Sequence, residues 1–271
     1  MLTTRPAAVA GTFYPADPAT LRGAVDRLLA AAAPARGAAP AVKALIVPHA
    51  GYVYSGPIAA AAYARLAAAA AGIRRVVLLG PAHRVPFRGL ALPGVDRFAT
   101  PLGAVAIDAA GAAIARRLPQ VADNAAAHAD EHSLEVQLPF LQRVLGEFAL
   151  VPLVVGAATG ESVAALLDLL WGGPETLIVI SSDLSHYHPY HDAQRMDRAT
   201  AAAILDLAPR LDHDAACGAT PVNGLLLAAR RRGLAPALLD LRNSGDTAGD
   251  RRQVVGYAAF GFSEAGSDGT H

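Results

Sequence analysis

The chain has 271 residues, of which 53% are hydrophobic and 17% are charged, and its formal net charge at pH 7 is zero. This length and composition allow a large buried core and exclude a disordered chain, while the balanced charge argues against a nucleic-acid-binding surface. The single cysteine, Cys217, excludes an internal disulfide and fits a reducing cytoplasm. The N-terminal residues lack the apolar segment of a signal peptide, and prolines and glycines interrupt the uncharged stretch 44–64. We therefore expect a cytoplasmic protein without a membrane segment.

Short apolar runs rich in β-branched residues alternate along the chain with alanine- and leucine-rich helical patterns. The helical patterns predict helices at 18–32, 56–71, 108–118, 131–146, 160–171, 190–208 and 221–232. The apolar runs predict strands at 44–48, 75–80, 148–156, 176–182, 235–241 and 254–262, and the turn residues of 90–108 predict an extra hairpin. Most of these runs are continuous rather than alternating, which is typical of strands buried on both faces.

This order of elements predicts an α/β fold with a central, largely parallel or mixed sheet flanked by helices. We expect one domain over residues 1–271. The alanine-rich tract 31–40 is the best candidate for a linker, and the polar residues 263–271, with His271, predict a frayed tail.

Polar residues directly follow three of the predicted strands. His49 follows 44–48, His83 follows 75–80, and Asp183 and His186 follow 176–182. Ligands of open α/β sheets bind beyond the carboxyl ends of the strands. Three histidines delivered to the same end therefore indicate a functional site more strongly than any one of them alone.

A second polar group lies in HADEHSLEVQLPFL, residues 128–141, where two histidines and two glutamates are each four residues apart. The HExxH pattern of zinc proteases is absent. Two interpretations stay open. The acidic residues favour a helix start through the helix dipole, or His132 and Glu135 support or line a substrate site.

Cys217 lies just before a predicted helix that begins at Thr220 and Pro221. Amide donors and the helix dipole at that place would lower the pKa of the thiol, which suits a metal ligand or a nucleophile. The alternative is a small buried apolar side chain. Ser55 is likewise predicted to cap the helix 56–71, with Pro57 in its first turn.

The segments PHAGYVYSG, GPAHRVP, DEHSLEVQLPF, SSDLSH and CGATPV occur in the order found in the Memo family, which the chain resembles over nearly its whole length. Bacterial and archaeal members are called AmmeMemoRadiSam system protein B, and they are similar in fold to the class III extradiol (LigB-type) dioxygenases, which use non-haem Fe(II). The resemblance implies that His49, His83 and Cys217 hold a metal, with Cys217 where the dioxygenases have a glutamate. It also implies that His186 is an acid–base catalyst with Asp183 beside it. His132, Glu135 and Tyr54 are the candidates for the wall of the cleft.

The resemblance implies Fe(II) as the cofactor, and a thiolate with two imidazoles also suits Cu or Zn. It further implies a small phenolic or aromatic substrate, and radical-SAM and AMMECR-type proteins as partners. Three functions stay open: an Fe(II)-dependent oxidoreductase, a metal protein that handles Cu or Fe without ring cleavage, and a peptide- or protein-binding module that reuses the cleft. A cysteine hydrolase is a weaker alternative, because the chain has no G-x-S-x-G motif.

Overall fold

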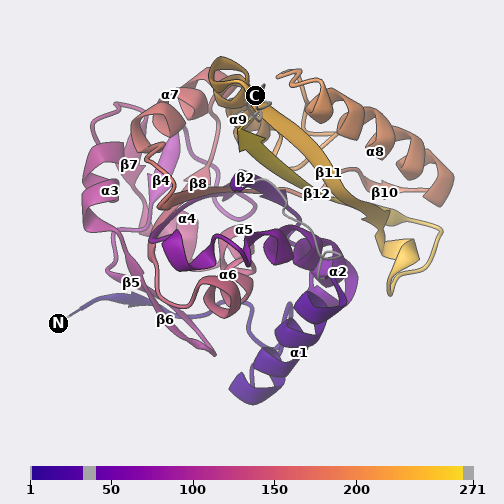
Figure 1. Cartoon of the computed structure of the whole chain (residues 1–271), viewed down its shortest axis with the longest axis horizontal. Helices are drawn as coiled ribbons and strands as arrows, with labels where there is room; N and C mark the ends of the chain where they lie inside the picture. Colours follow the sequence, from indigo (N-terminus) through magenta and orange to yellow (C-terminus); the bar gives the residue numbers. More distant parts are fainter. Residues whose placement is uncertain (1, 33–40, 265–271) are drawn as a thin grey trace, which may run out of the picture.

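One twelve-stranded sheet forms the centre of the computed structural model, which describes residues 2–32 and 41–264 (Figure 1). Its strands are β1 (Thr4–Arg5), β2 (Val42–Val47), β3 (Arg75–Pro81), β4 (Leu90–Leu92), β5 (Arg97–Thr100), β6 (Gly103–Ile107), β7 (Val121–Asp123), β8 (Ala149–Val155), β9 (Thr176–Ser181), β10 (His186–His188), β11 (Leu234–Asn243) and β12 (Val254–Glu264). The strand order is β1-β5-β6-β8-β3-β9-β2-β12-β10, while β11 pairs with β12, and β4 pairs with β7 and β8. Neighbours among β8, β3, β9 and β2 run parallel, whereas β12 is antiparallel to β2 and β11. The predicted α/β fold with a mixed central sheet is confirmed.

Helices cover both faces of the sheet. They are α1 (Pro18–Ala31), α2 (Tyr52–Tyr63), α3 (Ala109–Ala115), α4 (Ala125–Ala129), α5 (His132–Glu135), α6 (Leu138–Leu145), α7 (Gly160–Leu170), α8 (Tyr190–Leu205) and α9 (Ala219–Arg232), with short 3₁₀ turns at Ala64–Leu66, Ala70–Gly72 and Ser244–Asp246. Figure 1 shows α1, α2 and α6 on one side of the strands and α7, α8 and α9 on the other. Within the described ranges, none of the helices combines the length and the apolar character that a membrane crossing requires.

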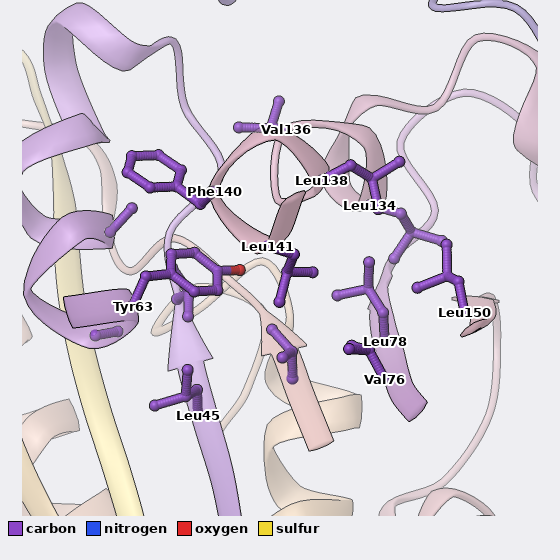
Figure 2. Close-up of a cluster of buried hydrophobic side chains, with 14 of the residues drawn as sticks. Leu45, Tyr63, Val76, Leu78, Leu134, Val136, Leu138, Phe140, Leu141 and Leu150 are labelled. Atoms are coloured by element: carbon purple, nitrogen blue, oxygen red, sulfur yellow. The ribbon is translucent and has the colours of Figure 1, made fainter. Parts of the chain in front are cut away.

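The two layers of helices explain why the strand sequences are continuously apolar. On β3, Val76 and Leu78 belong to the core on the α6 side, while Val77 and Leu79 belong to the core on the α7 side. Successive strand side chains point to opposite faces, so a strand between two helical layers needs apolar residues at every position. Figure 2 shows the first of these cores, in which side chains of β2, β3 and β8 pack against α2, α5 and α6.

The helix predicted at 56–71 begins earlier and ends earlier than its sequence suggested. Gly51 is the N-cap of α2 and the helix ends at residue 63, so the prediction that Ser55 caps it was wrong. Pro57 lies inside the helix rather than in its first turn. It lacks the N–H that would bind the carbonyl of Val53, but Val53 is 68% exposed and water can hydrate that carbonyl.

The single helix predicted at 131–146 is divided into α5 and α6. Pro139 lies in the first turn of α6 and has no N–H to continue a ladder from α5. Glu131 is the N-cap of α5, where its side chain accepts the N–H of Ser133. This short capped helix lies beside the ends of the central strands, where it carries side chains of the candidate site.

The other predicted segments are confirmed with small shifts at their ends, and the hairpin predicted within 90–108 is the antiparallel pair β5 and β6. Residues 33–40 of the predicted linker lie outside the described residues. So do residues 265–271 of the predicted tail, including His271, whereas residues 263 and 264 belong to β12.

Candidate metal centre

Three segments that are far apart in the sequence bring possible metal ligands to one edge of the sheet. His49 follows β2, His83 follows β3, and Cys217 precedes α9. One ligand atom from each of these side chains lies within 4.8 Å of the other two. Metal–nitrogen and metal–sulfur bonds of about 2.0–2.3 Å allow one ion to reach all three atoms. Two imidazoles and a thiol form a donor set that fits Fe, Cu or Zn.

The hydrogen bonds of Ser181 fix which nitrogen of His49 is free. The Ser181 hydroxyl donates to the carbonyl of Ser133 at 2.6 Å and accepts from the Gln137 amide at 2.8 Å. Its contact of 2.8 Å with His49 Nδ1 must therefore be accepted from an Nδ1–H. This tautomer leaves the lone pair on Nε2, which lies 3.4 Å from Cys217 Sγ. Burial, with the charges of neighbouring histidines, keeps the pKa of His49 well below its usual range, so the ring is neutral and able to bind a metal.

Glu131 fixes His83 in the same way. Its carboxylate accepts the backbone N–H of His83 at 2.6 Å and the Nδ1–H at 2.8 Å, which leaves Nε2 free. Burial alone would raise the pKa of Glu131, but the hydrogen bonds and charge of His83 outweigh it and lower the pKa to about 2. A carboxylate bound to the far nitrogen is the usual support of a metal-binding histidine.

Cys217 lies just before a helix, as predicted, but the pKa of its thiol is raised rather than lowered. The helix begins at Ala219 with Gly218 as its N-cap, not at Thr220 and Pro221. The thiol was predicted to have a lowered pKa, yet burial and the nearby Asp183 carboxylate raise it to about 12. Hydrogen bonds with the Asp183 N–H, the Ser182 hydroxyl and the Gly218 N–H lower the pKa of the thiol too little to offset this. Without a metal, Cys217 is therefore a neutral thiol.

Close packing at Gly218 brings Cys217 to the end of β9. The Gly218 N–H donates to the Ser182 hydroxyl at 3.0 Å. A Cβ at this position would lie 2.7 Å from the Ser182 Cβ and 2.8 Å from the Ser181 carbonyl oxygen. Glycine therefore permits an approach that other residues would block.

Asp183 supports the proposed ligands rather than His186. Its carboxylate accepts the backbone N–H of His49 at 2.7 Å, and its own N–H donates to Cys217 Sγ at 3.3 Å. None of the Asp183 hydrogen bonds found among residues 2–32 and 41–264 reaches His186, whose Nδ1–H is held by the Leu184 carbonyl instead. Burial raises the pKa of Asp183 to about 7. Its two contacts tie the loops that carry His49 and Cys217 to one another.

His186 has one committed and one available nitrogen. Its Nδ1–H donates to the carbonyl of Leu184 at 2.8 Å, so Nε2 carries the lone pair. Burial lowers the pKa of His186. A neutral imidazole in this place can accept a proton from a bound molecule.

His132 borders the same cluster. Its ring stacks on His83 with centroids 4.5 Å apart, and Phe13 lies 4.7 Å away. Its Nδ1 is buried without a hydrogen-bond partner among the described residues and lies 3.5 Å from the Glu131 carboxylate. Burial is the main cause that lowers the pKa of His132 to about 4, and the charge of His83 is the second. The ring is therefore neutral near pH 7 and forms an aromatic wall.

Known proteins resemble this chain over nearly its whole length. A family profile described as "Memo-like protein" matches residues 5–261. A MEMO1 family protein of Methanopyrus kandleri is 37% identical over 95% of this chain and 98% of its own length. The chain belongs to the Memo family. Another MEMO1 family protein, from Aquifex aeolicus, is 37% identical over 96% of this chain and 100% of its own length.

In this member of the Memo family, Glu135 supports the structure around the site and does not line the cleft. It is fully buried, and its two oxygens accept hydrogen bonds from Arg5, Tyr14 and the backbone N–H groups of Ala8 and Val9. A carboxylate with all these partners has no free oxygen for a substrate. Of the two roles considered for it, the geometry leaves the supporting one.

Sequence reasoning missed three residues that orient the ligands: Ser181, Gln137 and Glu131. Ser181 is the next-to-last residue of the strand predicted at 176–182, which was a usable signal, since polar side chains at that end of the strand lie near the site. Glu131 was noticed for its spacing, but its contact with His83 spans 48 residues and has no local signature. Tyr54, half-exposed in the first turn of α2, lies in a cleft beside this cluster.

Proposed function

We propose that this chain binds one transition-metal ion through His49, His83 and Cys217 and uses it as an oxidoreductase, with Fe(II) as the ion. The observation that carries the proposal is the convergence of three ligand atoms within 4.8 Å of one another. Both histidines support it further, because each holds its Nδ1–H in a hydrogen bond and leaves Nε2 free.

Bound Fe(II) would supply redox chemistry and open positions for oxygen and a substrate. In this proposal the substrate is a small phenolic molecule, and His186 Nε2 takes the proton of its hydroxyl. The Leu184 carbonyl holds the imidazole by its other nitrogen, so the ring presents the lone pair. His132 packs against the bound ring from the side of His83.

The proposal is tested on protein purified without oxygen. We expect about one equivalent of Fe(II) per chain after loading, and a Cys217→Ala variant that retains much less. Oxygen uptake is then measured with a panel of catechols and other phenols. A fully iron-loaded protein that consumes no oxygen with any of them would rule out the oxidoreductase proposal and leave metal binding.

The chemistry of Cys217 favours a second candidate, a protein that handles Cu or Fe without transforming a substrate. Thiolate is a softer ligand than a carboxylate and is itself open to oxidation. This candidate predicts tight Cu(I) binding that Cys217→Ala abolishes, together with the absence of oxygen uptake.

A further inference from the structure

A cleft lined by tyrosines lies next to the metal-ligand cluster and is not used by the proposed ligands. It has a volume of about 730 Å³, and its lining includes Tyr54 of α2, Tyr187 of β10 and Tyr257 of β12. Val255, another lining residue, is the partner of His186 in the β10–β12 pairing. The cleft is therefore continuous with the strand that carries the proposed base.

Tyr257 presents its hydroxyl to the cleft. The residue is only 2% exposed, yet within the described ranges its hydroxyl makes no hydrogen bond and is not one of the fully buried polar atoms, so the oxygen opens into the cleft that the residue lines. The hydroxyls of Tyr52 and Tyr63, on the same side of the sheet, are instead hydrogen-bonded within the fold. Burial and the nearby Asp183 carboxylate raise the pKa of Tyr257, so this hydroxyl keeps its proton and can donate.

Tyr187 is held in a conformation that its side chain disfavours. Its φ of 60° lies in the left-handed region, which a tyrosine side chain disfavours. The register of the β10–β12 pairing shifts between His186 and His188, on either side of Tyr187. The residue is 69% exposed, so the fold gains little burial from its ring. An exposed aromatic ring in a strained position beside His186 suggests a role in binding rather than in stability.

Tyr54 adds a second open aromatic surface. It is 39% exposed, and its neighbour Val53 is 68% exposed. Tyr54, Tyr187 and Tyr257 all line this one cleft. Arg252, the cation of the lining, is already paired with Asp250 at 2.8 Å. The cleft therefore offers aromatic faces and neutral donors, with Ser244 and Gln253 in its lining besides Tyr257, rather than a net charge.

We propose that this cleft binds a small planar aromatic molecule whose ring packs on Tyr54 and Tyr187 and whose carbonyl or carboxylate oxygen accepts a hydrogen bond from Tyr257. The proposal rests on the proposed function in one respect, because the bound molecule would be the substrate presented to the metal centre. Binding of this molecule, however, uses only side chains of the cleft, so it takes place whether or not the metal centre holds an ion.

The test is the binding of benzamide to the metal-free protein, followed by ligand-observed NMR. Cyclohexanecarboxamide is the matched probe, since it has the same amide without a planar ring. We expect benzamide to bind at least several-fold more tightly. Tyr257→Phe removes only the hydroxyl and should weaken benzamide binding by about five- to tenfold, as expected for one lost hydrogen bond. Tyr190→Phe is the control, because that hydroxyl bonds to Asp246 and the residue does not line the cleft.

Tyr187→Asn tests the strained position, since asparagine tolerates left-handed backbone. This variant should bind benzamide more weakly while its free energy of unfolding stays the same or rises. The proposal is overturned if wild-type protein binds neither probe, or if Tyr257→Phe binds benzamide as wild type does. It is also overturned if Tyr257→Phe lowers the free energy of unfolding, because the hydroxyl would then have a partner in the fold. Metal content is measured separately, so failure of this cleft and failure of the metal centre are distinguishable.

Discussion

Each proposed histidine ligand depends on one acceptor at its far nitrogen. Ser181 serves His49 and Glu131 serves His83, and both acceptors are themselves buried. Glu131 does more than accept one proton, because its second oxygen also takes the backbone N–H of His83. The orientation of the ring and of its loop are thus set by one carboxylate.

Glu131→Gln should therefore weaken metal binding while leaving every proposed ligand in place. The carboxylate serves three N–H donors, two of His83 and one of Ser133, whereas the amide has one oxygen and an NH₂ group that would face at least one of them. We expect a loss of about 10- to 100-fold in affinity, measured with Co(II) and a competing chelator. Glu161→Gln, at an exposed position, is the control. Unchanged affinity in Glu131→Gln would show that His83 needs no such support.

Cys217 gives metal binding a defined pH dependence. The raised pKa of about 12 keeps the thiol protonated in the metal-free protein, so binding must release its proton. Above pH 8 the Asp183 carboxylate, with its pKa of about 7, is already ionised and contributes little further release. The observed association constant for Co(II) should then rise by about tenfold per pH unit between pH 8 and 10. In Cys217→Ser the slope should be much flatter, and an equal slope in both proteins would contradict the assignment of Cys217 as a ligand.

At the scale of elements, the short helix α5 is held by the N-terminal segment. Arg5 donates to the backbone carbonyls of His128, in α4, and of Glu131, the N-cap of α5, and pairs with Glu135 at 2.6 Å. The side chains of Arg5 and Glu135 are 4% and 0% exposed. This contact joins residues 130 positions apart and fixes the helix that carries the support of His83.

Arg5→Met should lower the free energy of unfolding by about 3–5 kcal/mol, because it leaves the Glu135 carboxylate buried without its cation. The double variant with Glu135→Gln should recover part of that loss. Urea unfolding measures both. Arg143→Ala breaks the exposed pair with Asp26 and should cost no more than about 1 kcal/mol. A single Arg5→Met variant as stable as Arg143→Ala would contradict this account.

The sequence predicted the elements well where their pattern is local, and less well where long-range contacts decide. Continuous apolar runs identified the central strands because both faces of the sheet are covered. The division of the helix at Pro139 was present in the sequence as a proline, but the flanking helical pattern concealed it. The pKa of Cys217 was predicted in the wrong direction, since burial by β9 and the charge of Asp183 come from parts of the chain far from position 217.

At the scale of the whole molecule, a metal ion would join segments that only folding brings together. His49, His83 and Cys217 belong to loops at β2, β3 and α9, so an unfolded chain presents no equivalent site. A ligand that binds only the folded state stabilises it in proportion to the logarithm of its concentration. The supporting bonds from Ser181, Glu131 and Asp183 link the same loops without a metal, so the metal-free protein should fold and then gain stability on binding.

Raising free Co(II) to 100 times its dissociation constant should add about 2.7 kcal/mol to the free energy of unfolding. Urea unfolding over a series of Co(II) concentrations measures this increment. Cys217→Ser should lose most of it at the same concentrations, because the two remaining imidazoles bind far more weakly. His191→Ala, at an exposed position on α8, should keep the full increment. If Cys217→Ser gained as much as the wild type, the stabilising ion would be bound elsewhere. If neither protein gained stability, the three side chains would not form a metal site in the folded chain.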